Sequence, residues 1–288
     1  MKTIAFVHQK GGTGKTTACV NIAGCLVKQQ KKVLVVDMDP QGSATSSLGL
    51  SQNQKSSVYQ VLMEEKAISE CIFETESGIY IVPSAIDLLV IDIRFGQSTS
   101  HAHRLKNHLA KIAHHFDVIL IDAPSGHTSL IVNTIIAAAG HLIIPMDSGV
   151  FAYESLETFN VFLNQLAEAY HVPIHLMAVL LREELPRSPR KSSKNPFKSM
   201  AKLWETPEES VPVLNYLYEA DITAFWEKNG VTDVKIYRLP YSYEVVKSQI
   251  KGLPIVHCAP DSEIVKIYQQ ITTELNLLSP PRRLRGDL

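Results

Sequence analysis

The sequence lacks three features that would each assign it to a specialised class. It has only four cysteines, with no CxxC pair, and because an intracellular setting keeps thiols reduced we expect them to be core or surface residues (Cys19, Cys25, Cys71 and Cys258). No apolar run approaches the roughly 20 residues of a membrane span, and the one near the N-terminus is too short for a signal peptide. The formal net charge is −1, so the chain has no overall basic coat for nucleic acid. We therefore expect a cytoplasmic globular protein.

What the sequence does contain is an alternation of short aliphatic runs with longer amphipathic segments. This pattern is typical of a parallel sheet with crossover helices, and most of the runs are apolar throughout, as in strands covered on both faces. The expected strands are 3–8, 32–37, 78–84, 117–122, 141–146, 174–181 and 234–240, and the expected helices are 15–30, 100–114, 128–139, 153–170, 211–229 and 260–277. The prediction is an α/β fold with a doubly wound, mostly parallel sheet in a single domain over residues 1–278.

Two basic segments interrupt this rhythm. A stretch at about residues 184–210 is rich in lysine, arginine and proline, and we predict that it is a surface insertion. A solvated loop and a contact with nucleic acid or a partner are equally good readings of it. The second segment, residues 279–288, is predicted to be a basic, flexible tail.

The most specific motif is "HQKGGTGKTT", residues 8–17, which lies between the first expected strand and the first expected helix. Glycines allow backbone N–H groups to converge on an anion, and the N-terminus of a helix adds partial positive charge. Lys15 is placed to neutralise the β and γ phosphates of a nucleotide, and the Thr16 hydroxyl can bind Mg²⁺. The predicted phosphate-binding residues are Lys10, Gly11, Gly12, Thr13, Gly14, Lys15, Thr16 and Thr17. The motif leaves one question open, because a single phosphate loop does not need the second lysine, Lys10.

Carboxylates follow two other expected strands. Asp122 ends the run "DVILID", and Asp37 and Asp39 follow the run "KVLVV". Parallel strands end at one edge of a sheet, so these side chains are expected beside the phosphate loop. Asp122 and Asp39, together with Thr16, are the predicted metal site, with Asp122 acting through magnesium-bound water. Asp39 is also the better candidate for activating water.

Together, "KGGTGKTT", "VLVVDMDPQGSATSSLG", "VILIDAPS", "LIIP" and "LPYSYEVVKSQIKGLPI" resemble the ParA family of partitioning ATPases, in the deviant Walker group that also contains MinD. The resemblance spans roughly residues 2–277, apart from the segment around 184–210. It implies a P-loop NTPase that hydrolyses ATP slowly with Mg²⁺, and a homodimer with two ATP molecules sandwiched between the chains.

The resemblance also implies an answer to the question about Lys10. The matching lysine in the family reaches across the dimer interface to the phosphates bound by the other subunit. Lys10, Lys15 and Asp39 are then the predicted catalytic residues, and Asp37 supports their network. The resemblance further implies nonspecific DNA binding in the ATP state, association with the nucleoid, and stimulation by a ParB-like or other cargo adaptor.

The DNA contacts are the part of the pattern from which this chain departs. Where many relatives carry basic residues, the sequence "LPYSYE" places Tyr241 and Glu244. The remaining candidates for DNA contact are Arg190, Lys191, Lys194, Lys247 and Lys251. A nucleotide-dependent scaffold switch that positions an assembly without DNA therefore stays as the alternative.

Two other classes that use this loop fit the sequence poorly. A MinD-like membrane switch needs a terminal amphipathic helix, which "SPPRRLRGDL" cannot form, so no membrane partner is expected. An iron–sulfur reductase needs paired interface cysteines, and Cys19 and Cys25 lie on the helix that follows the loop.

Overall fold

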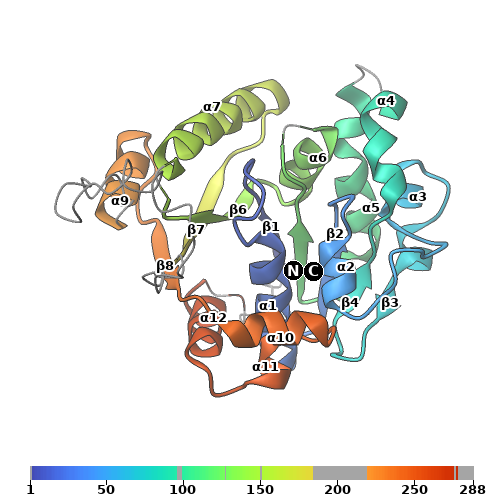
Figure 1. The fold of residues 1–288 in the computed structure, drawn as a ribbon. Coiled ribbons are helices and arrows are strands. Elements are labelled where there is room, and N and C mark those ends of the chain that lie inside the picture. Colours follow the sequence, from blue (N-terminus) through green and yellow to red (C-terminus); the bar gives the residue numbers. More distant parts are fainter. Residues whose placement is uncertain are drawn as a thin grey trace, which may run out of the picture.

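An eight-stranded sheet runs through the part of the chain that the structure describes (Figure 1). The structure is a computed structural model, and it describes residues 2–95, 99–126, 128–149, 151–183, 219–275 and 277. The strand order is β3-β4-β2-β5-β1-β6-β7-β8, and every pair is parallel except β3 with β4. The strands are β1 (Lys2–Phe6), β2 (Val33–Asp37), β3 (Phe73–Glu74), β4 (Tyr80–Val82), β5 (Val118–Asp122), β6 (His141–Asp147), β7 (His175–Arg182) and β8 (Lys235–Leu239).

Helices connect the strands and cover both faces of the sheet (Figure 1). The α-helices are α1 (Lys15–Lys28), α2 (Ser43–Ser47), α3 (Val58–Leu62), α4 (Ile91–Phe95), α5 (Arg104–Ile112), α6 (Ser129–Ala137), α7 (Ala152–Tyr170), α9 (Glu219–Lys228), α10 (Tyr243–Ile250), α11 (Ile255–Cys258) and α12 (Glu263–Glu274). Short 3-10 turns are η1 (Ile68–Cys71), η2 (Ile86–Val90), η3 (Thr99–His103) and η4 (Ala113–His115). None of the helices in the described ranges is both long and apolar enough to span a membrane.

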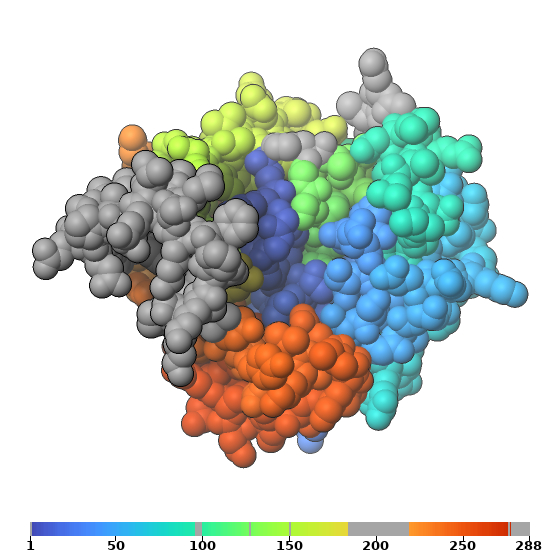
Figure 2. Space-filling view, in the orientation of Figure 1, coloured from blue at the N-terminus to red at the C-terminus, as the bar shows by residue number. Residues whose placement is uncertain are grey.

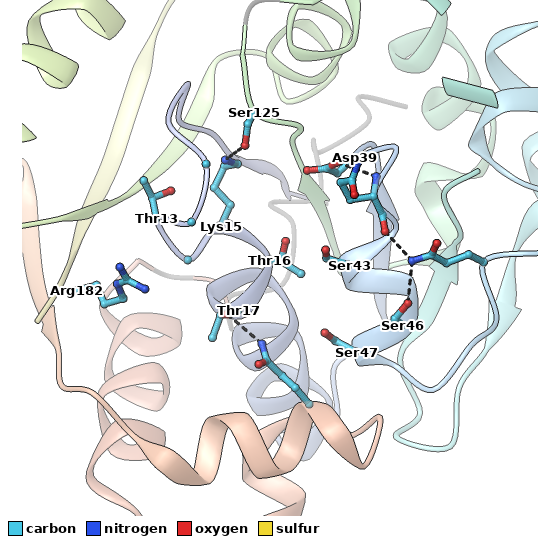
Figure 3. Close-up of a pocket in the computed structure, with 16 residues that line it drawn as sticks. Thr13, Lys15, Thr16, Thr17, Asp39, Ser43, Ser46, Ser47, Ser125 and Arg182 are labelled. Carbon is cyan, nitrogen blue, oxygen red and sulfur yellow. Dashed lines mark hydrogen bonds between the residues drawn. The ribbon is translucent and has the colours of Figure 1, made fainter. Parts of the chain in front are cut away.

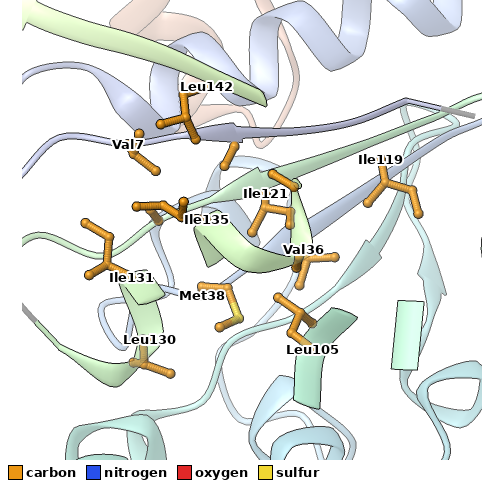
Figure 4. Close-up of a cluster of buried hydrophobic side chains, with 14 of the residues drawn as sticks. Val7, Val36, Met38, Leu105, Ile119, Ile121, Leu130, Ile131, Ile135 and Leu142 are labelled. Atoms are coloured by element: carbon orange, nitrogen blue, oxygen red, sulfur yellow. The ribbon is translucent and has the colours of Figure 1, made fainter. Parts of the chain in front are cut away.

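Alternate residues of each central strand pack into two separate apolar cores, one on each face of the sheet. Along β5, Ile119 and Ile121 pack with α5 and α6, as Figure 4 shows, whereas Val118 and Leu120 face the side that holds α1 and α12. The period of two in a strand sends successive side chains to opposite faces, and helices cover both of them here. This explains why the strands are apolar throughout, and the predicted doubly wound, mostly parallel single-domain fold is confirmed.

The chain reverses its direction across the sheet beside β1, which lies between β5 and β6. Such a reversal opens a crevice at the carboxyl ends of the strands, where open α/β sheets bind ligands. Parallel register places Asp37 opposite Asp122, and Asp122 opposite Phe6, at that same edge. The ends of three neighbouring strands therefore converge on one place.

The C-terminal helices are fixed against α1. The carbonyl oxygen of the Asn21 side chain accepts a hydrogen bond from the Ile255 backbone N–H at 2.7 Å. Gly24 allows the close approach, because a Cβ there would lie 2.4 Å from the Cβ of Pro254. As a result α10 lies beside the start of α1, where the Gln249 amide donates to the Thr17 hydroxyl at 3.1 Å.

Several elements differ from the sequence-based prediction. The two-residue strand β3 and the short helices α2, α3 and α4 were not predicted, because each is too short to show a clear period. The expected helix 100–114 is divided into η3, α5 and η4. The predicted insertion at about 184–210, the first part of the expected helix 211–229 and the tail 279–288 lie outside the described residues.

Candidate functional site

The phosphate-loop motif forms a tight turn between β1 and α1. Gly12 and Gly14 have positive φ angles of 75° and 97°, which L-residues with a side chain rarely adopt. Gly14 is the N-cap of α1 and offers no side chain to cap it, so the first N–H groups of the helix stay open to a ligand. The turn thus presents backbone donors at the positive end of a helix, which is an anion-binding arrangement.

This turn opens into a cavity of about 630 Å³, a volume that suits a small-molecule ligand (Figure 3). The cavity lies at the carboxyl edge of the sheet, and side chains from the segments that follow β2 and β5 and from α2, β7 and α10 complete its walls. The lining residues are Gly11, Gly12, Thr13, Gly14, Lys15, Thr16, Thr17, Asp39, Gln41, Ser43, Ser46, Ser47, Gln52, Ser125, Arg182 and Gln249. In Figure 2 the dark blue segment that carries the loop reaches the surface between the yellow-green α7 and the orange α10.

Lys15 extends from the first turn of α1 along the loop. Its Nζ donates to the Lys10 carbonyl at 3.2 Å and to the Ser125 hydroxyl at 3.0 Å, which aims the ammonium at the loop (Figure 3). Burial lowers the pKa of Lys15, while Asp122 and Asp39 oppose that shift. An ammonium held by two neutral oxygens in a buried place is a strong site for phosphate charge.

A buried carboxylate lies beside Thr16. The Thr16 hydroxyl donates to Asp122 Oδ2 at 2.6 Å, and Asp122 Oδ1 has no hydrogen-bond partner among the described residues. Burial, followed by the charge of Asp37, raises the pKa of Asp122 well above its usual range. A buried, unpaired carboxylate oxygen next to a hydroxyl supplies the hard oxygen donors that Mg²⁺ prefers, so these residues fit that ion.

The protein side of this cation site is small. Among the described residues no group of three or more His, Cys, Asp or Glu side chains gathers to hold a metal. Mg²⁺ usually keeps several waters and binds through one or two protein oxygens together with substrate phosphates. The Thr16 and Asp122 pair therefore suits a magnesium that arrives with a nucleotide.

Asp37 and Asp39 have different roles at the end of β2. Asp37 is fully buried, and its Oδ2 accepts from the Thr45 backbone N–H at 2.8 Å and from the Thr45 hydroxyl at 2.7 Å. Burial raises the pKa of Asp37 to about 6. Asp39 is half-buried, lines the cavity and lies across it from Lys15 (Figure 3). Asp37 thus anchors the segment that presents Asp39.

Lys10 does not line the cavity of its own chain. Its Nζ lies 2.7 Å from Asp147 Oδ2 at the end of β6. Its backbone N–H donates to His8 Nδ1 at 3.1 Å, and the His8 ring packs 5.4 Å from the ring of Phe159 on α7. Burial, followed by the charge of Lys15, lowers the pKa of His8 to about 4, so that ring is neutral near pH 7.

Of the predicted DNA-contact residues, only Lys247 and Lys251 belong to the described part of the chain. Lys247 and Lys251 are exposed at the C-terminal end of α10, where Lys247 lies 3.6 Å from Glu244 and 5.3 Å from the centroid of the Tyr243 ring. Arg190, Lys191 and Lys194 lie outside the described residues. The surface formed by α10 and the residues just before it also exposes large side chains, namely Tyr241, Tyr243, Val246 and Ile250.

Sequence reasoning missed several residues of the site. Ser125 follows Asp122 within the quoted "DAPS" motif, and Arg182 directly follows the expected strand 174–181 at the edge where the ligand was predicted, so both could have been found from their positions. Gln249 gave no signal, because only the packing of α10 brings it to the loop. Asp147 directly follows the expected strand 141–146, but the sequence gave no sign that it pairs with Lys10.

The chain is similar to proteins of known families. Residues 1–176, more than half of the chain, match a family model described as an AAA domain. The chromosome partitioning protein ParA of Caulobacter vibrioides is 30% identical over 185 residues, which are 63% of this chain and 69% of that protein. The match thus spans just over two thirds of the relative's length.

Two solved structures show the same fold. Cobyrinic acid a,c-diamide synthase from Mycobacterium smegmatis, solved with an ATP analogue and magnesium, is 30% identical with a TM-score of 0.61, over 65% of this chain and 77% of its own. The apo McdA of Cyanothece is 21% identical with a TM-score of 0.74, over 97% of this chain and 100% of its own. At the latter identity the comparison concerns the fold alone.

Proposed function

The chain belongs to the ParA family of partitioning ATPases, and on that premise we propose that it is a dimerising ATP switch that positions a cargo. The observation that carries this proposal is the single cavity that gathers the glycine turn, Lys15, the Thr16–Asp122 pair and Asp39. ATP is the substrate and Mg²⁺ the cofactor, in keeping with the relative solved with an ATP analogue and magnesium.

Different residues of the cavity bind the phosphates of ATP and the Mg²⁺ ion. The N–H groups of the turn and the Lys15 ammonium bind the β and γ phosphates, and the Ser125 hydroxyl keeps Lys15 in place. Thr16 would bind Mg²⁺, with Asp122 next to it. When bound, Mg²⁺ neutralises charge that builds on the phosphates during transfer.

Hydrolysis needs a positioned water and further positive charge. Asp39 orients the water whose oxygen attacks the γ-phosphorus, while the bond from phosphorus to the bridging oxygen of ADP breaks. Lys10 supplies the further charge to the nucleotide of the partner chain. A cation that acts only across the interface makes turnover depend on dimerisation.

In the ATP state the dimer binds DNA without sequence preference and associates with the nucleoid, and a cargo-bound adaptor protein stimulates hydrolysis. Lys247 and Lys251 on α10, with Arg190, Lys191 and Lys194, are the proposed phosphate contacts. Lysines that touch only phosphates position a protein on DNA without reading its sequence.

One observation favours a second candidate, a scaffold switch that positions an assembly without DNA. The α10 surface that carries Lys247 also exposes Ile250 by 81% and Tyr243 by 63%, and it includes the Lys247–Glu244 ion pair. Exposed aromatic and aliphatic groups next to paired charges suit a protein partner better than a phosphate backbone.

The test is DNA binding by the purified protein with ATP, ADP or no nucleotide, at two salt concentrations, on unrelated duplexes. We expect binding with ATP only, with a steep loss at the higher salt because lysine–phosphate contacts release counterions. Lys247→Gln should weaken binding, and Lys106→Gln, which changes an exposed lysine on α5, is the matched control. If the protein binds DNA in none of the three nucleotide conditions, the DNA role is rejected in favour of the scaffold switch.

A further inference from the structure

Lys10 and Asp147 form an ion pair within one chain. Lys10 Nζ donates to Asp147 Oδ2 at 2.7 Å, and the two side chains are 41% and 10% exposed. Within the described ranges this is the only ion pair that either residue makes. The lysine that is proposed to act on the partner's nucleotide is therefore held by its own chain.

The backbone around Lys10 is fixed, whereas its side chain is comparatively free. His8 accepts from the Lys10 N–H, Lys15 donates to the Lys10 carbonyl, and the Gln9 carbonyl accepts from the Gly126 N–H at 2.9 Å. Lys10 also carries a long, flexible stem that is partly in solvent. The ammonium can change partners by rotating that stem while the loop stays in place.

Asp147 is held more firmly than the lysine. It is the last residue of β6, and its Oδ1 accepts from the Gly149 backbone N–H at 3.3 Å. Because its side chain is mostly buried, the carboxylate loses stabilisation when the ammonium leaves and cannot recover it fully from water. The ion pair therefore favours the state in which Lys10 stays bound to Asp147 of its own chain.

We propose that Asp147 is a positioning residue that retains Lys10 in the single chain and so sets the threshold for forming the ATP dimer. The inference rests on the proposed function, in which Lys10 acts across the interface. In this proposal the Lys10 stem rotates away from Asp147 to reach the partner's phosphates, so Asp147 stabilises only the monomer side of the equilibrium. The phosphates of a nucleotide bound to the partner chain outcompete the single carboxylate for the Lys10 ammonium. A partner chain without nucleotide has no group that competes with Asp147.

The test is Asp147→Asn, which removes the charge but keeps an oxygen that can accept from Gly149. We expect the ATP dimer, measured by analytical ultracentrifugation with a non-hydrolysable ATP analogue, to form at about five- to tenfold lower protein concentration than in the wild type. Asp147→Glu, which restores the carboxylate, should return the threshold toward the wild-type value. Asp261→Asn, the same change at an exposed site, should leave the threshold unchanged.

A double-variant cycle with Lys10→Ala separates this inference from the proposed function. If Asp147 acts through Lys10, Asp147→Asn has no effect once Lys10→Ala is present. A measurably weaker ATP dimer in Lys10→Ala together with an unchanged or higher threshold in Asp147→Asn would overturn the retention role alone. A full ATP dimer with normal turnover in Lys10→Ala would overturn the proposed function itself. If Asp147→Asn does not fold by circular dichroism, Asp147→Ser removes the same charge and is judged by the same outcomes.

Discussion

The Thr16 hydroxyl lies 2.6 Å from Asp122 Oδ2, which joins the first turn of α1 to the end of β5. The hydrogen bond fixes the side chain that would bind Mg²⁺, and it leaves Asp122 Oδ1 without a partner among the described residues. A buried carboxylate in this state is costly in the absence of a cation and favourable in its presence. The pair is thus shaped for a ligand that brings positive charge.

Asp122→Asn tests this arrangement. The amide keeps the shape but loses the charge. We therefore expect the apparent affinity for Mg²⁺ in ATP turnover, measured by titrating MgCl₂ at fixed ATP, to be at least about tenfold weaker. Thr16→Ser keeps the hydroxyl and should stay near the wild type. Unchanged magnesium dependence in Asp122→Asn would place the ion elsewhere.

Asp39→Ala should separate ATP binding from hydrolysis. Asp39 lines the cavity but makes no hydrogen bond with Lys15 or Thr16, so its loss removes the positioned water and leaves the phosphate contacts. We expect turnover to fall by about 10²- to 10⁴-fold while the ATP dimer persists. The exposed Asp87→Ala makes the same change in charge outside the cavity. Normal turnover in Asp39→Ala would remove the role given to Asp39.

Arg182 is expected to contribute to nucleotide affinity. It lies at the end of β7, on the side of the loop away from Asp39, and its side chain has no ion-pair partner among the described residues (Figure 3). A guanidinium at the wall of a phosphate site attracts the anionic ligand. Arg182→Gln should weaken the binding of a fluorescent ATP analogue by about three- to tenfold. Arg94→Gln, at an exposed arginine on α4, is the control, and equal affinities in the two variants would contradict the role.

His8 should make stability depend on pH. Its folded pKa of about 4 lies below the ordinary value of 6.5, so between these values the unfolded chain binds a proton that the folded chain does not. The free energy of unfolding therefore decreases as the pH falls through that window, by up to about 3 kcal/mol from this group. His8→Gln keeps an acceptor for the Lys10 N–H and should remove that part of the slope in urea titrations at pH 7, 6 and 5. Identical slopes in the two proteins would refute the assignment.

The sequence predicted the central strands well because each is an apolar run between polar ends. Segments that depend on tertiary contacts were harder, since α2 and α4 are only five residues long and follow no visible period. The expected helix 100–114 is likewise divided into three pieces, of which η3 and α5 pack against α6, a tertiary contact that no local pattern encodes.

The site was predictable where motif and strand end coincide. The glycine turn, Lys15, Thr16, Asp39 and Asp122 all follow from the rule that ligands lie at the carboxyl ends of parallel strands. Gln249 lies more than 200 residues from the loop in the sequence and contacts it only because α10 packs beside the start of α1. The sequence offers no pattern for that contact. The pairing of Lys10 with Asp147 is of the same kind, because it depends on the position of β6 beside β1.

Mixing two inactive variants tests the central claim most directly. Lys10→Ala retains Asp39 but lacks the lysine for its partner, whereas Asp39→Ala retains Lys10. In a mixed dimer the nucleotide of the Lys10→Ala chain meets its own Asp39 and the other chain's Lys10. We therefore predict that an equal mixture recovers up to about a quarter of wild-type ATP turnover, because half of the dimers are mixed and one of their two sites is complete.

The control mixture pairs Lys10→Ala with the double variant that also carries Asp39→Ala, which supplies no Lys10, and it should stay inactive. Turnover in the first mixture but not in the control is the result that the account predicts. A first mixture as inactive as its separate components, although mixed dimers form, would show that Lys10 does not act across the interface.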